Sequence, residues 1–133
     1  MAVALRHTPR SGIEWRTTPK ATVSPSARDL EWAAGFIEGE GCFYRDYFPK
    51  DKTRIKTQSI QANQVNPEPI LRLQRLFGGT VKQSFNNCKL SDKCKPVWLW
   101  GVYGARARGV MMTLYSLLTG VRKQQVKHAL GLA

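Results

Sequence analysis

Two carboxylates, Glu38 and Glu40, lie two positions apart at the end of a helix-like segment, and a glycine follows each of them. The C-terminus of a helix carries partial negative charge, so a carboxylate such as Glu40 is electrostatically disfavoured there. A divalent cation bound nearby would reverse that preference. One interpretation of the segment is therefore metal-assisted chemistry. The other is an ordinary buried helix that ends in a Gly-Glu-Gly turn.

Small residues precede the carboxylates on the same segment. Gly35 and Gly39 are four positions apart, so they share one face of a helix. Each costs about 1 kcal/mol relative to alanine in a helix interior. The usual reason to keep such glycines is the close approach of another backbone, as in helix pairs that meet through small residues.

The segment from Ala33 to Gly41 resembles the signature of the LAGLIDADG homing endonucleases. The matching positions are Gly35, Phe36, Ile37, Glu38, Gly39, Glu40 and Gly41. The segment departs from the signature at Ala33, where the pattern has leucine, and at both acids, where it has aspartate. Glutamate is one methylene longer than aspartate, but it offers a metal the same oxygen ligands.

This resemblance implies a fold, an activity and a set of site residues. The implied fold is α+β, an αββαββα domain whose four-stranded curved antiparallel sheet forms a DNA-binding saddle. The implied activity is site-specific cleavage of double-stranded DNA with Mg²⁺ or Mn²⁺, as in nucleases of introns or mobile elements. The implied catalytic residues are Glu40, Gln64, Arg122 and Lys123, with Gln61 and Asn63 as rivals for Gln64. Glu40 and Gly39 are implied at the metal, while Glu38 caps structure or binds nearby.

The presence of one motif in the chain predicts a homodimer. Phosphodiester hydrolysis needs a positioned water, an in-line path and positive charge near the phosphorane, and divalent ions held by carboxylates supply these. Mg²⁺ prefers few protein oxygens together with waters and phosphate, so one carboxylate per subunit suffices where two copies meet. Two-fold symmetry then predicts a long, near-palindromic DNA site. The predicted interface residues are Ala34, Gly35, Glu38 and Gly39.

Periodicity and turn signals predict an order of elements that matches the implied fold. A capping box between Ser26 and Asp29 opens the motif helix. Prolines open the second helix, and Gly78 and Gly79 end it. The predicted strands are residues 42–48, 54–64, 80–85 and 97–103, and the predicted later helices are residues 66–77, 105–118 and 120–130.

Polar residues alternate along these strands, as in an antiparallel sheet with one packed face and one open face. Arg54, Lys56 and Gln58 are expected to share a face. Arginine, lysine and glutamine are side chains that pair with guanine and adenine edges in the major groove. The predicted DNA-binding residues are Arg45, Tyr47, Arg54, Lys56, Gln58, Gln61, Lys82 and Ser84. The alternative is a solvated polar face.

The charge of the chain favours a polyanionic partner. Lys and Arg total 21 against 9 Asp and Glu, a net charge of +12 over 133 residues. Residues 1–28 contain three prolines and little apolar periodicity, which predicts a flexible basic arm, with residues 29–133 as the endonuclease-like domain. Such an arm either follows a phosphate backbone or is an inert leader.

The cysteines and the hydropathy restrict the compartment. Cys42, Cys88 and Cys94 are an odd number, which favours a reducing compartment, cytoplasmic or organellar, over a disulfide scaffold. Zinc needs four ligands, so a zinc site is not expected. No transmembrane segment or signal peptide is visible, and neither a membrane nor a small-molecule substrate is expected.

Two other functions compete with cleavage. The same fold occurs in intron maturases and in DNA- or RNA-binding regulators that do not cut. A basic structural RNA-binding protein with an accidental motif is the third possibility. The carboxylate of Glu40 favours cleavage, because a pure binder gains nothing from negative charge beside a phosphate.

Overall fold

The chain folds into an α+β domain, described here from a computed structural model for residues 14–18, 24–84 and 96–132. Its helices are α1 (Ala27–Glu40), α2 (Pro67–Phe77), α3 (Gly104–Leu114), a 3-10 turn at Tyr115–Leu117, and α4 (Gly120–Leu130). Its strands are β1 (Glu14–Thr18), β2 (Gly41–Phe48), β3 (Asp51–Gln64), β4 (Gly79–Ser84) and β5 (Val97–Tyr103). The predicted αββαββα order is confirmed, although α3 ends four residues earlier than expected and gives way to the 3-10 turn.

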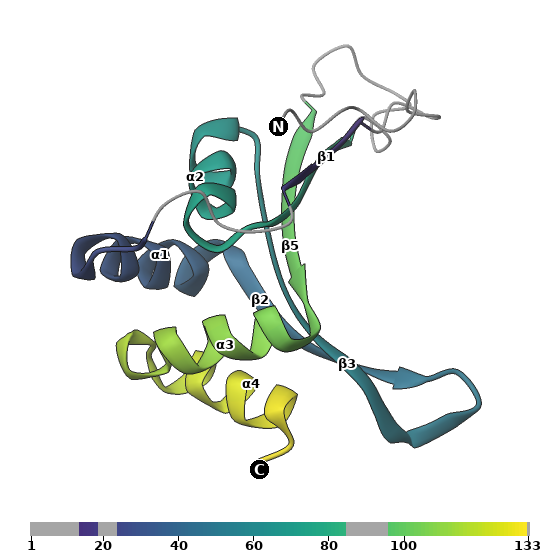
Figure 1. Ribbon diagram of the computed structural model, residues 1–133. Helices are drawn as coiled ribbons and strands as arrows, with labels where there is room; N and C mark the ends of the chain where they lie inside the picture. Colours follow the sequence, from purple (N-terminus) through teal and green to yellow (C-terminus); the bar gives the residue numbers. More distant parts are fainter. Residues whose placement is uncertain (1–13, 19–23, 85–95, 133) are drawn as a thin grey trace.

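The strands form one antiparallel sheet in the order β1-β4-β5-β3-β2. The four strands from β2 to β5 are those that the sequence predicts. Figure 1 shows the helices gathered on one side of this curved sheet, while the β2–β3 hairpin extends beyond them. Among the described residues, no helix covers the opposite side of the sheet over β3, β5 and β4, and this side is called the open face.

A fifth strand, β1, comes from the segment predicted to be a flexible arm. Glu14 pairs with Gln83 and Thr18 with Gly79, so β1 continues the sheet beyond β4. Backbone pairing with an edge strand needs no apolar periodicity, which is why the sequence pattern missed it. The segment does contain residues with strand preference, Trp15, Thr17 and Thr18. The rest of residues 1–23 lies outside the described part of the chain.

Local signals set the ends of the motif helix and of α2. The backbone N–H of Asp29 donates to the Ser26 hydroxyl at 3.1 Å, and the N–H of Ser26 donates to the Asp29 carboxylate at 3.0 Å, which confirms the capping box. Helix α2 ends at Phe77, because Gly78 and Gly79 take positive φ angles of 73° and 95°. None of the described helices is long and apolar enough to cross a membrane.

The core fixes α1 against the sheet. Ala33, Ala34 and Ile37 are buried on the inner face of α1. They belong to the same cluster as Ile60 of β3 and Trp100 of β5. The indole N–H of Trp100 donates to the carbonyl oxygen of Gly78 at 2.9 Å, which satisfies the polar group of a side chain that is 1% exposed. The outer face of α1 is thereby turned away from the sheet.

The β2–β3 hairpin departs from regular alternation. Asp46 pairs with Thr57 but Tyr47 pairs with Ile55, so β3 carries an extra residue at this point. The expectation that Arg54, Lys56 and Gln58 share a face is wrong for this reason. Gln58 is only 9% exposed and accepts a hydrogen bond at 2.9 Å from Arg108 of α3.

Candidate functional site

The carboxylate of Glu40 lies at a sharp corner between helix and strand. Glu40 is the last residue of α1 and is exposed, and β2 begins at the next residue. A Cβ atom on Gly41 would come within 2.7 Å of the Ile37 side chain and 2.9 Å of its carbonyl oxygen. The corner that follows Glu40 therefore needs glycine at position 41.

Gly35 and Gly39 form an exposed stripe on the outer face of α1. A Cβ atom at either position would find nothing within 4 Å. No neighbour in the described part of the chain therefore accounts for these glycines. Ala34, predicted beside them at an interface, is instead 2% exposed and belongs to the core, because it lies on the buried face of the helix with Ala33 and Ile37.

Glu38 binds the start of α4. Its carboxylate accepts hydrogen bonds of 2.8 Å from both the backbone N–H and the hydroxyl of Thr119, the N-cap residue of α4. These bonds place Glu38 in an intrachain contact, where the sequence assigned it also to a subunit interface. The Thr119 backbone N–H lowers the pKa of Glu38 most, and the Thr119 hydroxyl and the charge of Arg122 add to this effect.

Of the two basic residues predicted near the last helix, Arg122 reaches the motif. Its Nε donates to the Glu38 carbonyl oxygen at 3.0 Å, and its Nη1 lies 3.8 Å from the Cys42 sulfur. The ammonium of Lys123 instead lies 5.5 Å from the centre of the Tyr115 ring. The structure therefore brings Arg122, and not Lys123, to the residues on either side of Glu40.

The polar residues at the end of β3 lie close to the end of α1. Gly41 pairs with Ala62 and Cys42 with Gln61, so residues 61–64 run past the corner. The Gln64 side-chain oxygen accepts a hydrogen bond of 2.9 Å from the N–H of Val65. Gln61 and Asn63 are both exposed. Gln64 and its two rivals thus remain candidates for a residue that orients water.

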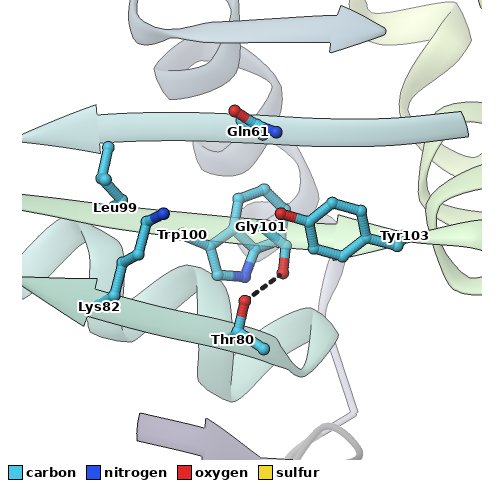
Figure 2. A pocket seen from close by; sticks show the side chains of 7 residues that line it. All are labelled: Gln61, Thr80, Lys82, Leu99, Trp100, Gly101 and Tyr103. Atoms are coloured by element: carbon cyan, nitrogen blue, oxygen red, sulfur yellow. Dashed lines mark hydrogen bonds between the residues drawn. The ribbon is translucent and has the colours of Figure 1, made fainter. Parts of the chain in front are cut away.

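The open face of the sheet carries a shallow polar pocket of about 70 Å³. Figure 2 shows Lys82 and Gln61 on neighbouring sides of it, with Tyr103 lying toward Gly101. A Cβ on Gly101 would meet the Tyr103 hydroxyl at 3.0 Å, so glycine at this position leaves room for the ring. The pocket is lined by Gln61, Thr80, Lys82, Leu99, Trp100, Gly101 and Tyr103.

Sequence reasoning found two residues of this pocket and missed the others. Gln61 and Lys82 were predicted to contact DNA, whereas Thr80, Leu99 and Tyr103 were not. The alternation of residues along β5 could have identified Leu99 and Tyr103. Successive residues of a strand face opposite sides, so these two face away from the buried Trp100 and Val102. Tyr103 is 51% exposed.

The other predicted DNA-binding residues are scattered. Arg45 lies over Tyr47 at 5.1 Å and contacts His128 of α4 at 3.3 Å, on the side covered by helices. Arg54 lies over Phe48 at 4.6 Å on the projecting hairpin, where Lys56 is exposed. Arg45 and Gln58 therefore face the helices and do not share a surface with Gln61 and Lys82 of the open-face pocket.

The donor set at the corner suits a hard divalent cation only in part. Within residues 14–18, 24–84 and 96–132, no group of three or more His, Cys, Asp or Glu side chains is placed to hold a metal. One chain offers the Glu40 carboxylate and the Gly39 carbonyl, one of the last carbonyls of α1, which lack a partner within the helix. Oxygen donors of this type fit Mg²⁺, and a second copy of the corner would double their number.

The lowered pKa of Glu38 predicts a stability that depends on pH. The folded pKa lies below the ordinary value of 4.5, so this contribution is complete above that value and is lost as the pH falls through the folded pKa. We expect Glu38→Gln to be less stable by roughly 1 kcal/mol near neutral pH, as for a lost helix cap. The difference from the wild type should shrink on acidification. Urea unfolding of both proteins, from neutral pH down through the folded pKa of Glu38, measures this difference. The control is Asp46→Asn, which removes an exposed carboxylate on β2.

The fold is that of the LAGLIDADG homing endonucleases, as comparison with solved structures shows. One match is the homing endonuclease I-CvuI in complex with its target in the presence of 2 mM Ca, with a TM-score of 0.55 and 20% identity over 80% of this chain and 67% of that chain. Another is I-CvuI on the I-CreI target with 2 mM Mg, where the DNA is not cleaved, with a TM-score of 0.54 and 20% identity over the same shares. No family model and no curated protein matches the chain. The similarity confirms the predicted α+β architecture.

Proposed function

We propose that this chain is a site-specific endonuclease that cuts double-stranded DNA as a homodimer. The observation that supports this most directly is the exposed Glu40 carboxylate at the glycine corner, next to the exposed stripe of Gly35 and Gly39. Two copies that meet through this stripe would bring two Glu40 carboxylates together. The I-CvuI structures that this chain resembles hold target DNA in the presence of Ca or Mg.

The proposed chemistry is hydrolysis of a phosphodiester at this corner. Glu40 and the Gly39 carbonyl would hold Mg²⁺ or Mn²⁺, and the bound ion would offset charge on the phosphate and favour a hydroxide nucleophile. Gln64 is the proposed residue that orients the attacking water. Its oxygen is bonded to Val65, and its amide nitrogen has no hydrogen-bond partner among the residues that the structure describes. Arg122 would donate to the phosphate.

The open face of the sheet is the proposed surface for DNA. The net charge of +12 supports attraction to the phosphate backbone, which falls with rising salt. Lys82 and Gln61 carry the donors and acceptors that read base edges in the major groove. Leu99 and Tyr103 add apolar surface to the same pocket, which suits contact with a thymine methyl group.

The test is selection of a cut site. The protein is incubated with a randomised duplex library with and without Mg²⁺, and the new ends are sequenced. We expect ends at one near-palindromic sequence that appear only with the cation. Tight duplex binding without any cut would favour a maturase or a DNA-binding regulator. Preference for short structured RNA over duplex would favour a structural RNA-binding protein.

A further inference from the structure

The ends of α1 and α4 supply each other with the charges that each helix lacks. The last turn of α1 contains no basic residue, and the first turn of α4 contains no acidic one. Each end is therefore left without the charge that its dipole favours. Arg122 of α4 donates to the Glu38 carbonyl at the end of α1, while the Glu38 carboxylate accepts from Thr119 at the start of α4. The two helix ends are joined by this reciprocal contact.

The contact holds the guanidinium of Arg122 in one orientation. Nε donates to the Glu38 carbonyl at 3.0 Å, and Nη1 donates to the side-chain oxygen of Gln125 at 2.9 Å. A planar guanidinium bonded at two of its nitrogens has little freedom to rotate. The side chain is only 15% exposed. The third nitrogen, Nη2, has no hydrogen-bond partner in the described part of the chain, so two N–H groups stay available to a ligand.

The position of Arg122 relates it to Glu40. Arg122 contacts Glu38 and Cys42, the residues two positions before and two positions after Glu40. The guanidinium therefore lies beside the end of α1 and the start of β2, the two segments that meet at Glu40. A fixed guanidinium with donors available in its plane is the group that recognises phosphate oxygens.

We propose that Gln125 and the Glu38 carbonyl are positioning groups that aim Nη2 of Arg122 at a nonbridging oxygen of the scissile phosphate. The inference rests on the proposed function, since it assigns an orienting role within the same site. Gln125 itself touches no substrate. Its hydrogen bond to Nη1 fixes the plane of the guanidinium, so that the remaining N–H groups meet charge that grows on the phosphate in the transition state.

The experiment compares Gln125→Ala with Gln124→Ala, its exposed neighbour on the same helix. Each is measured for single-turnover cleavage rate, DNA affinity and melting temperature. We expect Gln125→Ala to lower the cleavage rate roughly 10- to 100-fold, the scale of a misplaced catalytic group. Affinity and melting temperature should stay near those of the wild type, because alanine is a good helix former. Gln124→Ala should match the wild type in all three.

A second comparison asks whether Gln125 acts through Arg122. In an Arg122→Ala background, adding Gln125→Ala should lower the cleavage rate no further, because the group that it orients is gone. Equal rates for Gln125→Ala and the wild type, or additive losses in the double variant, overturn the inference and leave the proposed function standing. A wild type that cuts no duplex overturns both.

Discussion

We expect Glu40→Gln to abolish DNA cleavage and to leave DNA binding intact. The change removes a carboxylate that would hold the cation, and it keeps nearly the same volume. A bound metal ion stabilises the transition state of such a reaction by several kcal/mol. Losing the ion should therefore lower the cleavage rate about 100-fold or more. Binding should stay equal or tighten, because two carboxylates no longer repel phosphate at the centre of the dimer.

The fold of this variant should be unharmed. Glu40 is exposed at the C-terminus of α1, where a negative charge is unfavourable, so melting should occur at the same temperature or slightly higher. The measurement pairs a cleavage assay on the selected site in Mg²⁺ with a binding assay in the absence of divalent cations. Glu68→Gln, an exposed glutamate on α2, is the control. Cutting by Glu40→Gln at the wild-type rate would mean that the active carboxylate lies elsewhere.

Gly35→Leu should break the dimer without harming the monomer. Within one chain a Cβ atom at this position meets nothing within 4 Å, and leucine favours a helix by most of the roughly 1 kcal/mol that glycine costs. The isolated fold should therefore gain stability. A leucine between two closely packed helices costs about 1–3 kcal/mol or more, so association and cleavage should both fail.

The matched control is Gly109→Leu. Gly109 is also an exposed helical glycine at which a Cβ atom would meet nothing within 4 Å, but it belongs to α3. Sedimentation of each variant, alone and on DNA, measures association. Both changes should raise the monomer's stability, and only Gly35→Leu should change its assembly. A wild-type protein that sediments as a monomer in both conditions contradicts the two-fold arrangement.

The elements of this fold were predictable because local chemistry encodes them. The capping box at Ser26, the glycine pair after Phe77 and the alternation around Trp100 are short-range signals, and the structure follows each of them. The bulge in β3 was not predictable, since it depends on how two strands pair and not on the sequence of either one. It separates Arg54 from Gln58, which alternation with the buried Ile60 and Ala62 places on the core face.

The candidate site was predictable where the motif is contiguous and less so where distant segments meet. Glu40 and the exposed glycines follow from one helix and its end. Arg122 and Lys123 are neighbours of similar chemistry, and only the packing of α4 against β2 separates their surroundings. Ala34 was misassigned because small residues serve a buried face and an exposed face equally well. The strand β1 depended on backbone pairing that side-chain patterns do not record.

The exchange of charges between α1 and α4 also has a consequence for synthesis. Glu38 and Arg122 are 84 positions apart, so the contact that completes the corner closes almost the whole domain. Contacts over such separations form late in folding, after local helices and hairpins. A ribosome-bound chain that has not yet released α4 lacks both the Thr119 donors that bind the Glu38 carboxylate and the guanidinium that binds the Glu38 carbonyl oxygen. The end of α1 therefore reaches its final geometry only after α4 has left the ribosome, and any activity at this corner must wait for that step.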